Sequence, residues 1–246
     1  MKSNKNKLLL FGFFFFFSLI PLTNYAACYW IEPPPPANQP LKLAFFIYAS
    51  DVATESIIRP YADILGYDYG YIAFLYEDSN IDDVLDDIDD LEDYNDMLFF
   101  CFIGHGTYNE EGLQQSRVHY TPALTIGSMM LRYYFDQYEA GSIAVLIDSC
   151  HSGEFVDRFE DNDKYLIMTS SDENHTAYAY NTLPCELIFS DYFWNYVDGG
   201  DDAITAFYKT RADNYAHPAV NKYGKITHWI YRYPQITDTY GGYNFF

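Results

Sequence analysis

The sequence predicts an α/β sandwich in which helices cover both faces of a mostly parallel central sheet. Several short segments are almost wholly apolar, as strands buried on both faces of a parallel sheet require. Between them lie segments whose apolar residues recur at helical spacing. Strands that alternate with helices in this way form a sheet covered on both sides, so we expect a three-layer sandwich.

The expected strands share a run of apolar residues bounded by polar or turn-forming residues. The first, LKLAFFIYA, is apolar at nearly every position, which favours a strand with no solvent-exposed face. Two of the runs, DMLFFCFI and SIAVLI, lead directly into histidine- and cysteine-containing turns. We expect strands over residues 41–49, 71–76, 96–103, 142–147, 164–169 and 226–231.

The expected helices lie between these strands. The first should end at Gly66, because glycine commonly terminates a helix. Acidic residues crowd positions 82–93, but no glycine occupies the turn position of a calcium loop and the apolar residues keep helical phase, so we expect a solvated helix face there. Helices are predicted over residues 52–65, 81–91, 128–140, 186–197 and 201–214.

The first 27 residues have the features of an export signal or membrane anchor. Three lysines precede an apolar run over residues 8–22, and small residues follow it. Tyr25-Ala-Ala-Cys28 resembles a bacterial lipoprotein processing site, although tyrosine replaces the usual leucine. Lipidation of Cys28, simple cleavage and an uncleaved anchor all remain open. We expect an exported protein, secreted or held at the outer face of a membrane.

Residues 28–40 should form a stiff spacer, because four consecutive prolines begin at Pro33 and favour an extended conformation. The folded domain is then expected over residues 41–246.

Composition excludes several classes of function. The chain holds 14 Lys and Arg against 35 Asp and Glu, a net charge of −21, so phosphate backbones would be repelled and we expect no nucleic-acid partner. Four cysteines are too few for a disulfide scaffold. No spacing of cysteine and histidine suggests a zinc site, and we expect neither a metal nor a cofactor.

Two strand ends carry candidate catalytic residues. His105 follows the third expected strand within Gly104-His-Gly106, and Cys150 follows the fourth within Asp148-Ser-Cys-His-Ser-Gly. Active sites of parallel sheets form at the carboxyl ends of the strands, and sequential strands are often neighbours. The two side chains can therefore meet, although 45 residues separate them in sequence.

A neighbouring cysteine and histidine supply the chemistry of acyl transfer. The thiolate of Cys150 would be the nucleophile, and His105 would activate it and later protonate the leaving amine. The N–H groups of Gly106 and Cys150 would hold the developing oxyanion. His151 is a poor partner for Cys150, because adjacent side chains of an extended segment diverge. Cys101 and Cys185 lie in apolar contexts and are expected in the core.

These residues resemble the caspase-like cysteine peptidases. The shared pattern is an apolar strand followed by His-Gly, and a second apolar strand followed by Asp/Glu-x-Cys. The segment Asp148-Ser-Cys-His-Ser-Gly153 is similar to the metacaspase form. Over residues 41–200 the order of features resembles the legumain family more closely, for example in Arg59-Pro-Tyr-Ala-Asp63. The resemblance implies a caspase-like fold, with His105 as general base and Cys150 as nucleophile.

The legumain resemblance also implies a substrate pocket formed by Arg59, Asp148 and Asp191. Such a mixed-charge pocket suits the neutral amide of asparagine, whereas Asp148 alone would select arginine or lysine, as in metacaspases. The sequence departs from the family at Pro60, which replaces a pocket histidine. It also departs at Ile57, which stands where legumains have the asparagine that orients the catalytic histidine. That third group is therefore expected to be lost or supplied by backbone.

The sequence thus predicts an exported cysteine endopeptidase that cleaves proteins or peptides after Asn or Asp. Three alternatives stay open: an Arg/Lys-specific peptidase, a transpeptidase that uses an amine in place of water, and an inactive peptide-binding module.

Overall fold

A computed structural model describes residues 27–29, 40–109, 115–121, 124–177, 187–214, 216–220, 226–237 and 245–246. Three of the sequence predictions lie outside these residues, wholly or for the most part: the export segment upstream of Ala27, the spacer (at residues 30–39) and the core position of Cys185. Within the described part of the chain, the model has no helix that is both long and apolar enough to cross a membrane.

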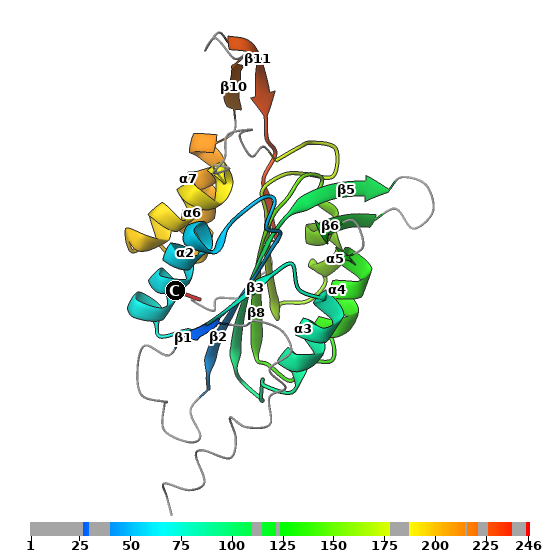
Figure 1. The fold of residues 1–246 in the computed structure, drawn as a ribbon, viewed down its shortest axis with the longest axis vertical. Coiled ribbons are helices and arrows are strands. Elements are labelled where there is room, and N and C mark those ends of the chain that lie inside the picture. Colours follow the sequence, from blue (N-terminus) through cyan, green and yellow to red (C-terminus); the bar gives the residue numbers. More distant parts are fainter. Residues whose placement is uncertain are drawn as a thin grey trace, which may run out of the picture.

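A seven-stranded, mostly parallel sheet forms the centre of the molecule (Figure 1). Its order is β1-β3-β2-β4-β8-β9-β12, in which the five inner strands run parallel and the two edge strands, β1 and β12, run antiparallel to their neighbours. The strands are β1 (Ala27–Tyr29), β2 (Lys42–Tyr48), β3 (Ile72–Glu77), β4 (Met97–Ile103), β8 (Ser142–Asp148), β9 (Tyr165–Thr169) and β12 (Gln235–Ile236).

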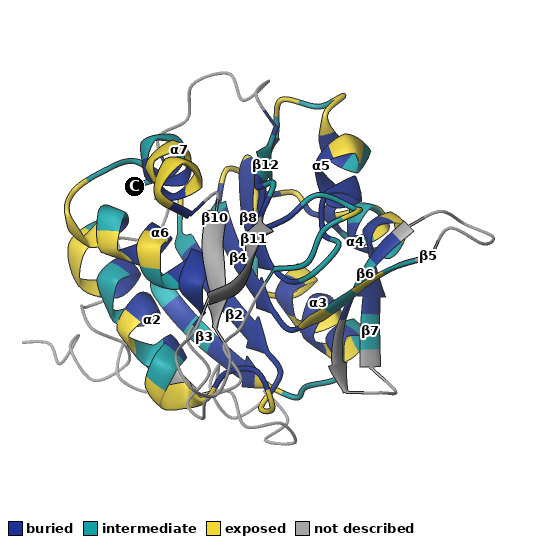
Figure 2. Cartoon of the chain, turned by 90° about the horizontal axis from the view of Figure 1, so that it is seen from above, coloured by how far each residue is buried: buried dark blue, intermediate teal, exposed yellow. Residues whose placement is uncertain are grey.

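Helices cover both faces of this sheet, so the predicted three-layer α/β sandwich is confirmed (Figures 1 and 2). One face carries α2 (Glu55–Tyr69), α6 (Ile188–Asp198) and α7 (Ala203–Asn214). The other carries α3 (Ile81–Asp89), α4 (Ser128–Phe135) and α5 (Glu154–Phe159). This arrangement is consistent with the caspase-like fold that the sequence resemblance implies.

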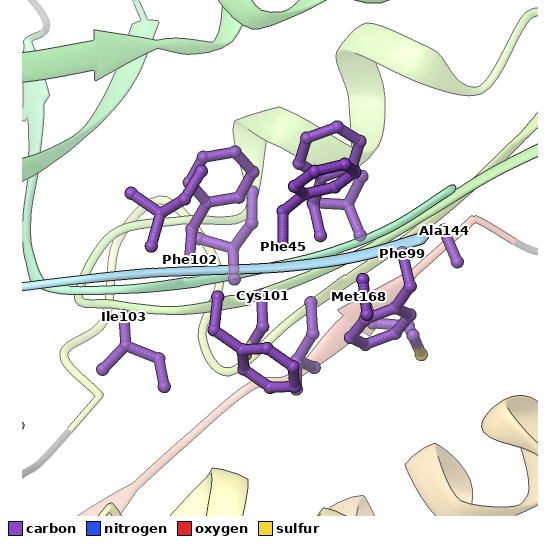
Figure 3. Packing of buried hydrophobic residues seen from close by; sticks show 14 of the residues in the cluster. Phe45, Phe99, Cys101, Phe102, Ile103, Ala144 and Met168 are labelled. Atoms are coloured by element: carbon purple, nitrogen blue, oxygen red, sulfur yellow. The ribbon is translucent and has the colours of Figure 1, made fainter. Parts of the chain in front are cut away.

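Alternating side chains of β4 fill the two halves of the core (Figure 3). Phe100 packs on Phe135 of α4, with ring centroids 4.6 Å apart. Its neighbour Phe99 points to the opposite face and contacts Trp194 of α6 at 5.6 Å. Cys101 is fully buried on that face, as the sequence predicts. A strand buried on both sides needs apolar residues at every position, which explains the continuous run of the sequence.

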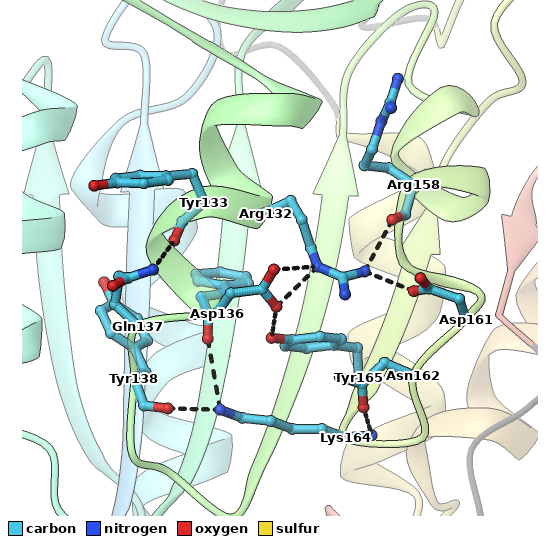
Figure 4. A network of polar contacts seen from close by, with 11 residues as sticks. Arg132, Tyr133, Asp136, Gln137, Tyr138, Arg158, Asp161, Asn162, Lys164 and Tyr165 are labelled. Carbon is cyan, nitrogen blue, oxygen red and sulfur yellow. Dashed lines mark hydrogen bonds and ion pairs between the residues drawn. The ribbon is translucent and has the colours of Figure 1, made fainter.

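A polar cluster centred on Arg132 ties α4 to α5 and β9 (Figure 4). Its guanidinium donates to both carboxylate oxygens of Asp136 at 2.8 Å, to the Arg158 carbonyl at 3.0 Å and to Asp161 at 2.8 Å. The Tyr165 hydroxyl donates to the same Asp136 carboxylate at 2.7 Å. Arg132 therefore joins three elements at the edge of the sheet where β9 begins.

Two helix ends differ from the sequence prediction. The first helix continues through Gly66, which is buried, and ends at Tyr69, because Gly70 adopts the left-handed conformation with φ 73°. A left-handed glycine is the stronger stop signal, since it lets the last carbonyl groups find partners. Helix α4 ends at Phe135, before the predicted limit of residue 140.

Two small sheets lie beside the central one. The strands β5 (His105–Asn109), β6 (Gln115–Thr121) and β7 (Leu124–Gly127) form an antiparallel meander between β4 and α4 in sequence. The strand predicted over residues 226–231 is β11 (Ile226–Tyr231), but it pairs with β10 (Ala216–Val220) and not with the central sheet.

Candidate active site

The central sheet brings His105 and Cys150, the two predicted catalytic residues, to the carboxyl ends of its parallel strands. β4 and β8 are parallel neighbours, and Ile103 pairs with Asp148 at their carboxyl ends. His105 and Cys150 each lie two residues beyond this pair. Because the two strands are paired in register and each residue follows its strand by the same distance, the His105 turn lies beside the Cys150 turn.

The two turns touch backbone to backbone. An ideal Cβ built on Gly106 would lie only 1.6 Å from the carbonyl oxygen of Cys150, so no side chain fits at this position. The Gly104 N–H donates to the Asp148 carbonyl at 3.3 Å and extends the contact. Gly106 is therefore required for the close approach of the His105 segment to the nucleophile.

His105 faces a carboxylate that the sequence analysis missed. Its Nε2 lies 3.1 Å from Oδ2 of Asp51, and both side chains are about two-thirds exposed (65% and 66%). A proton on Nε2, donated to Asp51, leaves the Nδ1 lone pair free to accept a proton. The sequence analysis expected the third group to be lost or supplied by backbone, whereas in this structure a side-chain carboxylate contacts the His105 ring. Asp51 follows the carboxyl end of β2, at the same end of the sheet as His105 and Cys150. This position after a strand was the sequence feature that could have identified it as a candidate site residue.

The Cys150 side chain contacts a backbone carbonyl group. Its Sγ donates a hydrogen bond to the carbonyl oxygen of Ala177 at 2.9 Å. Burial has the largest effect and raises the pKa of the thiol, a backbone hydrogen bond with Ala177 lowers it, the negative charge of Asp148 raises it, and the positive charge of Arg232 lowers it. Desolvation penalises the charged form, so the burial of Cys150 favours the neutral thiol.

Arg232, which the sequence analysis did not single out, is a buried cation whose charge lowers the pKa of the Cys150 thiol. It is 1% exposed and donates to Asn214 Oδ1, at the end of α7, over 2.5 Å. It lies between β11 and β12, and β12 pairs with the carboxyl end of β9. The signal in the sequence was a single arginine within the aromatic segment Trp229-Ile-Tyr-Arg-Tyr233.

Buried serines hold the turn that carries Cys150. The Ser149 carbonyl accepts hydrogen bonds from the hydroxyls of Ser152 and Ser171, both at 3.0 Å. All three residues are almost fully buried. The turn also approaches the next loop closely, because a Cβ on Gly153 would lie 2.5 Å from the Cα of Asp172. Small side chains therefore allow the nucleophile turn and the 170–177 segment to pack together.

Two of the three predicted pocket residues lie around Tyr61. Asp148 is 8% exposed, and its Oδ2 accepts hydrogen bonds from the Ser190 N–H at 3.1 Å and the Ser190 hydroxyl at 2.6 Å. Asp191 accepts a hydrogen bond from the Tyr61 hydroxyl. Burial, this hydrogen bond and the charges of both carboxylates raise the pKa of Tyr61 far above its ordinary value.

Arg59, the third predicted pocket residue, forms an ion pair with Glu55 on its own helix. It lines a surface cavity of about 650 Å³, next to the carboxyl end of β3. Pro60 and Glu77 line the same cavity. Arg59 thus lines this cavity, whereas Asp191 accepts a hydrogen bond from Tyr61 and Asp148 accepts hydrogen bonds from Ser190.

Within the described residues, no cluster of three or more His, Cys, Asp or Glu side chains has the arrangement of a metal site.

Comparisons with known proteins add only likenesses of fold. No protein-family model matches the sequence. No curated protein sequence matches it either. Among solved structures, the chain is similar to Raptor of Chaetomium thermophilum, with 13% identity over 71% of this chain and a TM-score of 0.48. It is also similar to drICE, a caspase, with 14% identity over 72% of this chain and a TM-score of 0.44. The match spans 19% of the Raptor chain and 82% of the drICE chain.

Proposed function

We propose that this chain is a caspase-like cysteine endopeptidase with His105 as general base and Cys150 as nucleophile. The observation that carries the proposal is the contact of Gly106 with the Cys150 carbonyl, which holds the histidine turn against the cysteine turn. This contact lies beyond the ladder that joins β4 and β8, which ends at Ile103 and Asp148.

The proposed reaction is acyl transfer through a thioester. Nδ1 of His105 takes the Cys150 proton, and the thiolate attacks the substrate carbonyl carbon. The N–H groups of Gly106 and Cys150 are the proposed donors to the oxyanion. The imidazolium returns its proton to the leaving amine, and water then hydrolyses the acyl-enzyme. Asp51 stabilises the imidazolium and fixes the tautomer, through its contact with Nε2.

The proposed substrate is a protein or peptide with Asn, or protonated Asp, before the cleaved bond. A buried guanidinium near the nucleophile disfavours a substrate arginine or lysine, because like charges repel strongly in a desolvated site. Arg232 provides this repulsion in addition to the proposed pocket cation Arg59. Asp148 and Asp191 supply acceptors for a substrate amide.

The test is the ratio of kcat/KM for matched peptides that carry Asn or Arg before the cleaved bond. We expect preference for Asn by at least tenfold, and a smaller ratio in Arg59→Ala. Preference for Arg that Arg59→Ala leaves unchanged would favour the Arg/Lys-specific alternative. Adding an amine nucleophile to the assay distinguishes hydrolysis from transpeptidation, because only a transpeptidase would give mostly the aminolysis product.

We further propose that the protein is exported, on the evidence of its lysine-rich, apolar N-terminal sequence and Tyr25-Ala-Ala-Cys28. Membrane association would then depend on whether Cys28 is lipidated or the segment is retained. Metabolic labelling with a fatty acid, compared between the natural chain and Cys28→Ser, tests lipidation directly.

A further inference from the structure

Every second carbonyl of the segment Glu173–Ala177 accepts a hydrogen bond from the nucleophile turn. The His151 ring Nδ1 lies 2.9 Å from the Glu173 carbonyl. The His151 backbone N–H donates to the His175 carbonyl at 2.9 Å. The Cys150 thiol donates to the Ala177 carbonyl, also at 2.9 Å. Two adjacent residues therefore supply three donors to one short segment.

His151 adopts a conformation that favours this contact. Its φ is +56°, in the left-handed region that non-glycine residues rarely occupy. Reversal of the chain at this residue directs both its backbone N–H and its ring towards the same segment. Since a carbonyl oxygen only accepts, the ring carries its proton on Nδ1 in this contact.

The segment has a second anchor on its other side. His175 Nδ1 lies 2.6 Å from Asp172 Oδ1, and the His175 ring packs on Tyr233 with centroids 4.1 Å apart. A Cβ at Gly153 would collide with Asp172, so the backbone is also tightly packed there. The Ala177 carbonyl is consequently held at a fixed place beside Sγ.

We propose that His151 is a positioning residue that fixes the Ala177 carbonyl so that it retains the Cys150 thiol proton until substrate binds. This inference rests on the proposed peptidase function and adds a resting-state lock to it. A substrate backbone N–H that takes the Ala177 carbonyl displaces the thiol, which then turns to Nδ1 of His105. Binding of a peptide thus releases the nucleophile, and the free enzyme keeps its thiol unreactive towards other electrophiles.

The first test compares alkylation of Cys150 by iodoacetamide in the wild type and in His151→Asn. Asparagine tolerates the left-handed conformation and keeps the backbone N–H but removes the ring. We expect alkylation of Cys150 to be at least threefold faster in His151→Asn, because the less firmly held Ala177 carbonyl retains the thiol proton less well. We also expect a lower kcat/KM for peptides. Glu173→Gln is the matched control, since it changes only a side chain and keeps the carbonyl. Alkylation that is unchanged or slower in folded His151→Asn would overturn the proposal.

The second test uses the wild-type enzyme and so does not depend on folding of a variant. Two peptides are compared, one of which has an ester oxygen in place of the N–H of the residue before the cleaved bond. We expect at least a tenfold fall in kcat for the ester peptide, because its binding leaves the thiol on Ala177. A changed KM with unchanged kcat would contradict the lock. If neither peptide is cleaved, the proposed function fails, while the alkylation comparison still decides the lock.

Discussion

At the scale of single residues, the account depends on polar groups arranged around one thiol. Asp51 provides the first prediction. Asp51→Ala should lower kcat about tenfold to a hundredfold. Asp51 only orients the general base and is exposed, so its removal should cost part of the rate gain that acid–base catalysis supplies. Steady-state kinetics on the folded variant measure this. The control is Asp89→Asn, which should have wild-type kcat. Asp89 is exposed at the last residue of α3, at the opposite end of the sheet from the site. An Asp51→Ala enzyme with full kcat would show that the His105–Asp51 contact is only a surface ion pair.

A substitution of Gly106 provides a second prediction at the scale of single residues. In Gly106→Ala the new methyl group would meet the Cys150 carbonyl at 1.6 Å, and the obstacle is backbone that cannot swing aside. The two turns must separate, and a displacement of about 1 Å at reacting groups can lower the rate about a hundredfold. We expect that loss with a melting temperature only a few degrees lower, since the turns lie outside the apolar core. Activity within twofold of the wild type would mean that the contact has no role in catalysis.

The residue scale also shows where sequence reasoning stopped. His105 and Cys150 were visible because each follows an apolar strand, and the register of β4 and β8 places their turns together. Asp51 and Arg232 were missed, because the sequence signals for them are weak: the position of a single acidic or basic residue does not tell whether its side chain faces a site. Arg59 illustrates the converse, since the resemblance named it but the structure pairs it with Glu55.

At the scale of elements, apolar strands were predicted well and strands of mixed polarity were missed. The continuous apolar run of β4 predicts a buried strand, whereas β5 to β7 have mixed polarity and no continuous apolar run. Helix α5 has only six residues, too few for a helical period to be evident. The meander matters for the site, because β5 begins at His105 itself.

Gly70 gives a prediction about an element. It ends α2 with φ +73°, and no atom lies within 4 Å of the place where a Cβ would be, so a substitution costs conformational strain without a clash. Gly70→Ala should lower the free energy of unfolding by about 1 kcal/mol. Gly70→Asn should lower it less, because asparagine visits the left-handed region more readily. Urea denaturation of both variants measures the order, and equal losses would contradict this explanation of the helix end.

At the scale of the whole molecule, the central sheet should fold without the N-terminal region. A chain that starts at Pro40 keeps the Leu41 N–H, which donates to Asp96 Oδ1 at 2.7 Å, and every inner strand. Of the residues that the structure describes, it lacks only β1, which has three residues and pairs with β3 at the sheet edge. We expect this chain to be soluble, monodisperse and as active as one that starts at Ala27. Loss of activity or aggregation of the shorter chain would show that the edge strand is part of the folded unit.

The central claim is that Cys150 is a nucleophile activated by His105, and one measurement tests it most directly. The protein is incubated with a peptide that carries an electrophilic ketone after an asparagine, and the intact mass and the modified residue are determined by mass spectrometry. The account predicts one adduct per chain, on Cys150, with labelling of His105→Ala slower by at least a hundredfold and none of Cys150→Ala. Labelling of wild type and His105→Ala at equal rates, or modification only of other cysteines, would contradict it and leave the inactive peptide-binding module as the better description.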